Sequence, residues 1–519
     1  MTLFQKDNIS EKTESIWHKT VHLPSFRSLD QDIHTDVAII GGGLTGIVSA
    51  YRLAVRGVKV ALVEADRLAS STTGNTTAKI TVQHGLIYQE LIAHFGKEKA
   101  RQYFDANNEA LSWLRKLCQS SDISCTYATA PAILYAATDN ERRSIEREKE
   151  AYDCLGIPAQ FSDSVDLPID TKGGLTIADQ AQFHPLMFLH FLVSELVRMG
   201  AAIYEGTLAY DLEKKPSLAV VTKDGRKIHC RDVLICSHFP FYDANRLYFA
   251  RMYPERSYLI ACADCESVPQ GMYLSAGDPR RSLRSAVCDG RQIVLVGGEN
   301  HKTGQGGSTT DHYIRLQGFA DAVLGENQMI AHWSAQDYTS LDKVPYIGLL
   351  AKNEPHLYVA AGFRKWGMTT AVVAAKLFSD TILGKHNPYT ELFNPSRFEA
   401  DPMIKTFIIE GAIVGKELVK GKLDRKQRLL DELGNNQGVI VTINGQRAGA
   451  YRDEEGSLSL VNTTCTHMGC EVNWNQAEKT WDCPCHGSRF SANGEVIDGP
   501  ALDPLKKLYQ EPSQEQPKG

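Results

Sequence analysis

The stretch DVAIIGGGLTGIVSAYRLAVRGVKVALVEA, residues 36–65, places a glycine-rich turn between an apolar run and a segment with helical periodicity. Val37–Ile40 and Val58–Val63 are short, continuous apolar runs, which predict two buried strands. Leu44–Arg56 repeats apolar residues at helical spacing and predicts the helix that joins them. A strand–helix–strand unit of this kind is typical of a parallel α/β domain.

The glycines of the turn follow the spacing of a dinucleotide-binding loop. Gly41, Gly43 and Gly46 form G-x-G-x-x-G directly after the first strand. In such loops the first glycine makes the tight turn, the second admits a pyrophosphate, and the third lets helix and strand pack closely. Glu64 ends the second strand, where an acid accepts hydrogen bonds from ribose hydroxyls. The sequence therefore predicts a bound dinucleotide.

The composition limits the classes of protein to which the chain can belong. Its 519 residues suffice for roughly three domains. With 43% hydrophobic and 23% charged residues, the chain is too apolar to be disordered. A net charge of −6 without a long basic run argues against nucleic-acid binding. No apolar run is long enough to span a membrane, and the N-terminus lacks the apolar core of a secretory signal, so we expect a cytoplasmic protein.

The rest of the chain changes pattern near its C-terminal end. Residues 95–155 and 185–199 are mostly helical in pattern, and further helices are expected over 369–383 and 404–433. Beyond Gly434, short alternating runs predict a small antiparallel β module. We therefore expect four regions, which are a lead at 1–35, a large α/β domain at 36–398, a helical linker at 399–432 and a β module at 433–512.

Four of the twelve cysteines lie close together in the β module. Cys465-x-His467 is followed, after fifteen residues, by Cys483-x-x-His486. This pattern resembles a Rieske [2Fe–2S] centre, in which two thiolates hold one iron and two imidazoles hold the other. Zinc is the alternative, but finger-type sites place a cysteine pair before a histidine pair, whereas these ligands alternate. The sequence thus predicts these four residues as ligands of an iron–sulfur cluster.

The remaining two cysteines of this group lie beside the predicted ligands. Cys470 and Cys485 resemble the pair that forms a disulfide in the high-potential Rieske proteins of cytochrome bc complexes. Gly499 and Pro500 resemble the proline loop that covers the cluster in those proteins. The resemblance implies a disulfide between Cys470 and Cys485. Because the cytosol is reducing, either this bridge is buried and protected or the pair is reduced in vivo, and we expect the buried bridge.

The large domain resembles the D-amino-acid oxidase/glycine oxidase family of FAD-dependent oxidoreductases over about residues 36–395. The resemblance rests on the first strand–helix–strand unit, on SSTTGNTTAK at 70–79, and on LDKVPYIG followed by LYVAAGFRKWGMTTA. It implies an FAD-binding Rossmann-like domain interleaved with an α+β substrate domain, followed by a small all-β Rieske domain. It also implies three sets of FAD-binding residues, which are Gly41, Gly43, Gly46 and Glu64 at the ADP part, Thr73 and Gly74 near the isoalloxazine, and Gly362, Gly367 and Met368 in a closing loop.

The source of the electrons can be narrowed further. The chain has no cysteine between residues 288 and 465, so we expect FAD to be held non-covalently. The only other glycine-rich stretch, residues 297–307, does not fit a second dinucleotide fingerprint, so NAD(P)H is not the expected electron donor. The resemblance implies instead a small amine or amino acid that is oxidised at its C–N bond. Arg284, Arg364 and Lys365 are candidates to bind a substrate carboxylate, and no catalytic residue can be named.

The two cofactors together suggest an internal electron relay. We expect electrons to pass from the flavin to the cluster, and from an exposed histidine edge of the cluster to an external one-electron acceptor. Two alternatives stay open, which are an oxidase that uses O₂ with a structural or regulatory cluster, and a non-enzymatic redox sensor or electron-transfer protein. A Rieske oxygenase is disfavoured, because His184 and His190 lack an acid at the matching spacing. Membrane-surface contact by the helix at 404–433 is a further alternative.

Overall fold

A parallel sheet forms the base of the large domain in a computed structural model that describes residues 13–120, 123–244, 246–398, 400–423, 430–443 and 445–510. The sheet has six strands in the order β18-β19-β12-β2-β3-β8, and only β18 runs antiparallel to its neighbour. Their bounds are β2 Val37–Ile40, β3 Val60–Val63, β8 Ala202–Tyr204, β12 Asp232–Ile235, β18 Tyr346–Leu349 and β19 Leu357–Ala361. All four residues of β2 are buried, because both faces of the sheet are covered.

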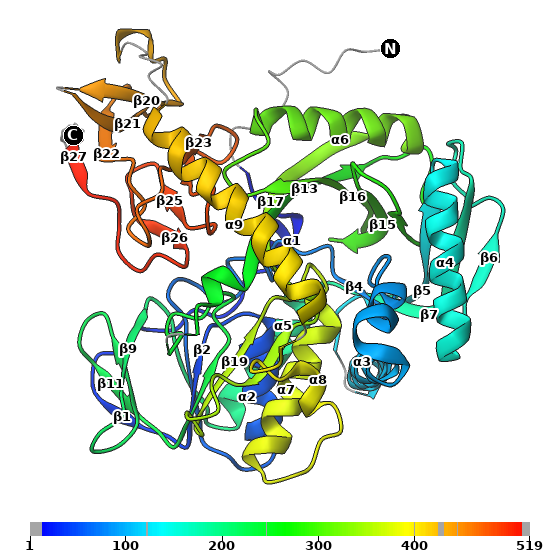
Figure 1. Cartoon of the computed structure of the whole chain (residues 1–519), viewed down its shortest axis with the longest axis horizontal. Coiled ribbons are helices and arrows are strands. Elements are labelled where there is room, and N and C mark those ends of the chain that lie inside the picture. The colour runs from blue at the N-terminus through cyan, green and yellow to red at the C-terminus, as the bar shows by residue number, and fades with distance from the viewer. Residues whose placement is uncertain are drawn as a thin grey trace.

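Alternate residues of β2 enter two different cores. Val37 and Ile39 pack with three helices, which are α2 Leu44–Ala54, α5 Pro185–Arg198 and α7 Gly367–Ile382 (Figure 1). Ala38 and Ile40 pack against a four-stranded sheet of β1 Ile33–His34, β9 Ala209–Glu213, β10 Ala219–Thr222 and β11 Lys227–His229. The sheet is therefore buried on both sides, as its continuous apolar strands predict.

A second, nine-stranded sheet lies above this base (Figure 1). Its strands are β4 Lys79–Ile80, β5 Ala128–Ala136, β6 Gln160–Ser162, β7 Gly173–Gln182, β13 Met252–Ala263, β14 Met272–Ser275, β15 Arg281–Cys288, β16 Arg291–Lys302 and β17 Gln328–Ser340. Three helices accompany it, which are α3 Tyr88–Ser120, α4 Asp139–Leu155 and α6 Thr309–Leu324. The chain enters the two sheets repeatedly, so the two subdomains are interleaved. The helical pattern at 95–155 is interrupted by β5, which the sequence analysis did not separate.

The C-terminal β module consists of two four-stranded antiparallel sheets. The first contains β20 Gln437–Ile443, β21 Gln446–Arg452, β22 Leu458–Asn462 and β27 Lys507–Gln510. The second contains β23 Asn473–Asn475, β24 Thr480–Asp482, β25 Arg489–Ser491 and β26 Val496–Asp498. Trp481 is fully buried in the core of the module and packs against Trp474. These strands confirm the predicted antiparallel module.

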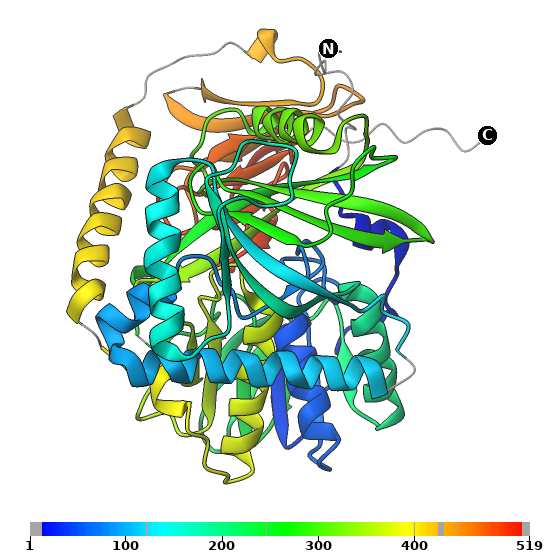
Figure 2. The same cartoon turned by 90° about the vertical axis from the view of Figure 1, so that its right-hand side faces the viewer.

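Helix α9, Ala400–Leu423, connects the large domain to this module across the outside of the molecule (Figure 1, Figure 2). The helix begins earlier than the sequence pattern indicates, with non-helical backbone angles at Asp401. Part of the predicted helix at 404–433, residues 424–429, lies outside the described residues. Within the described part of the chain, no helix is both long and apolar enough to cross a bilayer.

The N-terminal lead is more than a polar extension. Helix α1, Ile16–Thr20, buries Trp17 completely in the large core. The Trp17 indole donates a hydrogen bond to the carbonyl of Thr76 at 2.7 Å, and the Ser15 hydroxyl donates to the carbonyl of Gly74 at 2.6 Å. The lead therefore fixes the loop at 70–77, which the structure places on a large cavity.

Candidate active site

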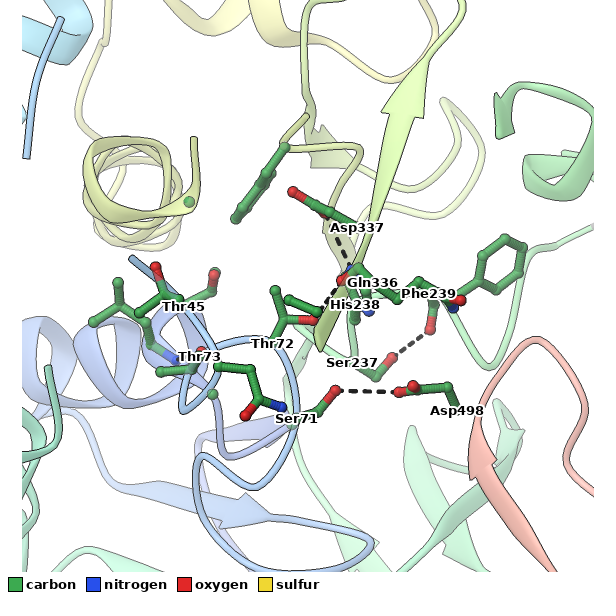
Figure 3. Close-up of a pocket in the computed structure, with 18 of the residues that line it drawn as sticks. Thr45, Ser71, Thr72, Thr73, Ser237, His238, Phe239, Gln336, Asp337 and Asp498 are labelled. Carbon is green, nitrogen blue, oxygen red and sulfur yellow. Dashed lines mark hydrogen bonds and ion pairs between the residues drawn. The ribbon is translucent and has the colours of Figure 1, made fainter. Parts of the chain in front are cut away.

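A cavity of about 570 Å³ lies between the parallel base and the nine-stranded sheet (Figure 3). Gly41 and Gly43 line it at one end, and the loop at 70–77 lines its side. Residues 360–368 close it from the end of β19 into α7, so three segments far apart in sequence meet here. The cavity is also lined by residues 496–502 of the C-terminal module.

The glycine turn has the geometry of a dinucleotide cradle. Gly41 has φ of +108°, and a Cβ there would lie 2.5 Å from the carbonyl oxygen of Cys236. A Cβ on Gly46 would lie 2.0 Å from the carbonyl oxygen of Gly41, so only glycine lets α2 approach β2 this closely. Gly46 does not line the cavity, and its role is to let the helix pack closely on the glycine turn. The α2 N-terminus offers backbone N–H groups toward a phosphate.

Glu64 lies on the cavity wall at the end of β3. Its carboxylate accepts hydrogen bonds from the backbone N–H of Gly42 at 2.7 Å and of Asp66 at 3.0 Å. Burial raises the pKa of this carboxyl. The acid thus joins the glycine turn to the end of the neighbouring strand, at the position where ribose hydroxyls bind in dinucleotide folds.

The loop at 70–77 contacts both sides of the cavity. The Thr73 hydroxyl accepts a hydrogen bond from the Leu44 N–H at 3.0 Å, so Thr73 lies against the start of α2. Thr72 donates to the carbonyl of Gln336 at 2.8 Å (Figure 3). Gly74 does not line the cavity, because it packs against His18, whose Nε2 would lie 2.1 Å from an added Cβ.

The closing loop presents Gly362, Gly367 and Met368 to the cavity, together with Arg364 and Lys365. Arg364 and Lys365 have φ of +54° and +69°, in the left-handed region. The Arg364 guanidinium donates to the carbonyl of His84 at 2.8 Å, and the Lys365 ammonium lies 4.0 Å from the Glu255 carboxylate. The Arg364 guanidinium is thus hydrogen-bonded within the protein, whereas the Lys365 ammonium has a distant carboxylate and no hydrogen-bond partner among the described residues.

Lys79 is a cavity residue that the sequence analysis did not single out. Its ammonium is buried and donates to the carbonyl of Tyr273 at 2.7 Å and to the Ser282 hydroxyl at 2.6 Å. Arg284 lies behind it, fully buried, and makes only long hydrogen bonds to the carbonyls of Ala78 and Phe183. Among the described residues, neither cation forms an ion pair with a carboxylate.

Burial and, to a smaller extent, the neighbouring guanidinium of Arg284 together lower the pKa of Lys79 to about 7. Burial also lowers the pKa of Arg284, to about 9. Two adjacent buried cations without a counter-charge create a positive potential on this part of the cavity wall. An ammonium carries three N–H donors, and two of those of Lys79 are used, so one remains for an anionic ligand.

The four predicted cluster ligands come together in the C-terminal module. The His467 and His486 rings lie 5.1 Å apart, and the loops that carry them are closed by the hydrogen bonds Cys465 N–H to Cys470 O and Cys483 N–H to Ser488 O, both 2.8 Å. The neighbouring Cys483 thiol lowers the pKa of Cys465 to about 7. The Nδ1 atom of His486 is buried without a hydrogen-bond partner among the described residues. Two thiols and an unpartnered imidazole nitrogen fit an iron–sulfur cluster.

A disulfide joins Cys470 to Cys485 beside these ligands. Both cysteines are buried, with 2% and 4% of their surface exposed. The sulfur atoms of Cys470, Cys483 and Cys485 lie within 4.8 Å of one another, but the bridge leaves only Cys483 of these three as a thiolate ligand. Among the described residues, His184 and His190 are not part of any such group. His184 caps α5 through the Met187 N–H, and His190 is exposed.

The sequence of the large domain matches the family of FAD dependent oxidoreductases over residues 36–381. The chain belongs to this family. Residues 427–509 match the Rieske [2Fe-2S] domain. The predicted fold class and both predicted cofactors, FAD and a [2Fe–2S] cluster, are thereby confirmed, and the chain is an FAD-dependent oxidoreductase with a C-terminal Rieske domain.

Relatives of this two-domain enzyme share both parts or one of them. The Bacillus subtilis protein YhfW, whose name describes a Rieske 2Fe-2S iron-sulfur protein, is 46% identical over 96% of this chain and 98% of its own. Glycine oxidase from Geobacillus kaustophilus superposes with a TM-score of 0.59 at 18% identity, covering 70% of this chain and 99% of that one. L-amino acid deaminase from Proteus vulgaris has a TM-score of 0.57 at 17% identity over 73% and 100%.

The Rieske domain packs directly on the FAD domain of this oxidoreductase. The Tyr338 hydroxyl lies 2.9 Å from the carbonyl of Gly499 and 3.2 Å from that of His486, and the Gln336 side chain donates to the carbonyl of Gly487 at 2.8 Å. Ser71 in the cavity loop donates to Asp498 at 3.1 Å (Figure 3). One wall of the cavity is therefore built from residues 496–502 of the Rieske domain, which follow the predicted cluster ligands in the chain.

The expected exposed histidine edge is only partly present in this arrangement. His486 has only 8% of its surface exposed, and His467 is half-buried. The ring of Phe249, in the FAD domain, lies 5.5 Å from the His467 ring and 5.2 Å from the His486 ring. Packing of an aromatic side chain on both imidazoles explains the difference, because it covers the edge that a separate Rieske domain would expose. Met468, which follows His467, is 51% exposed.

A buried ionic network fixes the two domains to each other. Glu478 of the Rieske domain lies 2.5 Å from Arg256 of the FAD domain and 2.5 Å from Arg489 of its own domain. Arg489 also pairs with Asp482 at 3.2 Å and with Asp498 at 3.1 Å. Burial by itself raises the pKa of Glu478, but Arg256 and Arg489 outweigh this effect and lower the pKa to about 2. Every charge in the network has an opposite partner, as a buried site requires.

Proposed function

We propose that this enzyme oxidises a small amine or amino acid at its C–N bond and that the electrons leave through the Rieske cluster to an external one-electron acceptor. The observation that carries the proposal is the shared wall, since residues 496–502 of the Rieske domain line the FAD cavity. A separate function of the two domains would not require this contact. Glycine oxidase and L-amino acid deaminase, which have the same fold, support the substrate class.

The residues around the cavity supply the binding geometry. When bound, FAD accepts two electrons from a substrate, and the cluster carries one electron at a time. We assign Gly41, Gly43, Gly46 and Glu64 to the ADP part of FAD, Thr73 and Gly74 to the loop that supports the ring system, and Gly362, Gly367 and Met368 to the closing loop. Cys465, His467, Cys483 and His486 are assigned as the cluster ligands.

Non-covalent attachment of FAD is inferred from the lack of a reactive cysteine among the described residues of the cavity wall. Cys236 is the single cysteine among the described residues of the cavity wall. Burial raises the pKa of its thiol, which therefore stays protonated and unreactive. We also place the protein in a reducing compartment, the cytoplasm, which is consistent with ten free cysteines in the described part of the chain and with a buried disulfide.

The acceptor is expected to approach the cluster from the Met468 side. Phe249 covers the two imidazole rings on the side of the FAD domain. Met468 is half exposed and lies next to His467 in the chain, so it is the open part of this ligand loop. Electrons would thus enter from the FAD cavity on one side of the cluster and leave on the other.

Lys79 is proposed as the residue that binds the anionic group of the substrate. The geometry leaves one N–H of its ammonium for a cavity ligand, and Arg284 strengthens the positive potential. Arg364 donates to the carbonyl of His84, and Lys365 has the Glu255 carboxylate 4.0 Å away to offset its charge, so both are the weaker candidates. Arg284 does not line the cavity. A substrate that carries a carboxylate next to its amine could accept a hydrogen bond from Lys79 on this part of the cavity wall.

Replacing Lys79 by methionine should lower kcat/KM for a carboxylate-bearing amine by about 10- to 100-fold, because a charge-assisted hydrogen bond is lost. The pH profile gives a second readout. Lys79 carries its charge below about pH 7, so kcat/KM should fall as the pH rises through that value, and this fall should disappear in Lys79→Met. Lys365→Met is the matched control and should keep the fall in kcat/KM above about pH 7. An unchanged profile in Lys79→Met would remove Lys79 from substrate binding.

The substrate class can be tested with matched compounds. Anaerobic mixing of the purified enzyme with a panel of amino acids and with the 2-hydroxy acids of the same carbon skeletons should bleach the flavin absorbance only with members of the first set. Bleaching by the hydroxy acids, or by neither set, would contradict oxidation at a C–N bond. Formation of hydrogen peroxide in air in proportion to turnover would favour an oxidase instead of an external acceptor.

A further inference from the structure

The outer surface of helix α9 carries an unusual concentration of exposed apolar side chains. Ile404, Phe407, Ile408 and Ile409 are 49%, 51%, 63% and 49% exposed, and Phe398, just before the helix, is 67% exposed. In both views the helix runs along the outside of the molecule, with no other element over its outer side (Figure 1, Figure 2). Large exposed apolar side chains that gather on one element mark an interaction surface.

The inner side of α9 accounts for its contacts with the rest of the chain. Val414 and Leu418 pack on the core that surrounds the cluster ligands, and Met403 is buried near the start of the helix. The Glu410 carboxylate forms an ion pair with Lys302. Glu417 lines a small cavity between the two domains. The acidic residues of the helix from residue 404 onward are therefore directed toward the protein.

The outer side of α9 carries lysines beside its apolar residues, whereas the acidic residues from 404 onward lie on the inner side. At 100° per residue, Ile404, Ile408, Gly411, Ala412 and Gly415 fall on one stripe, and all five residues are exposed. The charged residues that border this stripe between 404 and 416 are Lys405 and Lys416, both exposed. The chain as a whole has a net charge of −6. From residue 404 onward the apolar stripe is flanked by lysines, and the one exposed acid nearer the start of the described helix, Asp401, pairs with His94 at 3.3 Å. This charge pattern on an acidic protein matches a surface that is apolar and anionic.

We propose that the outer face of α9, defined by Phe398, Ile404, Lys405, Phe407, Ile408 and Lys416, docks on an anionic lipid surface. An amphipathic helix of this kind lies in the plane of the interface, with its apolar side chains below the headgroups and its lysines among them. Each lysine near such a surface strengthens binding by about fivefold. The contact is peripheral, because no helix of the described chain can span a bilayer.

Vesicle flotation of the purified, full-length holoenzyme tests this proposal. We expect binding to vesicles of phosphatidylglycerol and much weaker binding to vesicles of phosphatidylcholine, with a decrease as salt is added. Ile408→Asp should weaken binding about tenfold or more, because an exposed apolar side chain that would enter the membrane interface is replaced by a carboxylate. Lys405→Gln should weaken it by about fivefold. Flavin absorbance, unchanged in both variants, would show that the fold is intact.

Two control variants separate this surface from general effects. Val197→Asp alters a side chain that is 52% exposed on α5, and Lys352→Gln removes an exposed lysine elsewhere; neither should change vesicle binding. Failure to bind phosphatidylglycerol, or equal losses in Ile408→Asp and Val197→Asp, would overturn the proposal. A dimer in solution that Ile408→Asp dissociates, without vesicle binding, would show that a second copy of the chain covers the face and would also overturn it.

Discussion

Gly41→Ala is expected to yield protein that purifies without FAD. The added Cβ would lie 2.5 Å from the carbonyl oxygen of Cys236 and would have to adopt φ of +108°, which L-residues rarely do. The collision is with backbone at the end of β12, so no side-chain movement can relieve it. The turn and the N-terminus of α2 must shift, and both lie at the end of the cavity where the ADP part of FAD is proposed to bind.

The ratio of flavin to protein absorbance measures this effect. Gly318→Ala is the matched control, because Gly318 lies in α6 with nothing within 4 Å of an added Cβ, and it should retain FAD. The EPR signal of the reduced Rieske cluster should be the same in both variants, since the nearest atoms to an added Cβ on Gly41 belong to Cys236 and Ser237, and an added Cβ on Gly318 meets nothing within 4 Å. Normal FAD content in Gly41→Ala would exclude this turn as the cofactor cradle.

Glu478→Ala should loosen the contact between the Rieske and FAD domains by about 3–5 kcal/mol, because it leaves Arg256 and Arg489 buried beside each other without their shared carboxylate. Hydrogen exchange of residues 498–502, which line the FAD cavity, should then become about 100-fold faster or more. Glu495→Ala removes an exposed carboxylate that pairs with Lys507 and should change exchange little. Equal exchange in both variants would mean that the ionic network does not hold the domains together.

The same network predicts how docking depends on pH. The pKa of Glu478 is about 2 in the folded protein, below the value of about 4.3 of an unperturbed glutamate. The contribution of Glu478 to stability is therefore fully present above about pH 4.3 and is lost as the pH falls toward about 2. Hydrogen exchange of residues 498–502 should accelerate over this range in the wild type and should do so less in Glu478→Ala.

Local sequence patterns were sufficient to predict the glycine turn and the four cluster ligands. The glycine turn and its flanking strands depend on neighbours within thirty residues, so G-x-G-x-x-G with a terminal acid predicted β2, α2 and β3 with small errors at their ends. The alternation of Cys465 and His467 with Cys483 and His486 likewise predicted the four side chains that the structure brings together. In both cases the chemistry requires a fixed spacing along the chain.

Features that depend on the packing of distant segments could not be predicted in this way. Lys79 is the first residue of the short strand β4 and follows a polar stretch, and its importance arises only because Arg284, 205 residues later, lies behind it without a carboxylate. Trp17 belongs to a lead without a clear pattern, yet it anchors the cavity loop. The Rieske pattern predicts an exposed imidazole edge in isolation, and only the docking of Phe249 covers it.

The central claim is that the flavin and the cluster of one chain form a single electron path. The most direct test mixes the holoenzyme anaerobically with an amine that bleaches the flavin, and follows flavin absorbance and the EPR signal of the reduced cluster together. The account predicts that the EPR signal of the reduced cluster appears after the flavin is bleached, with one electron per chain taken up by the cluster, in the wild type and not in Cys483→Ser. A bleached flavin beside a cluster that remains EPR-silent would contradict the account.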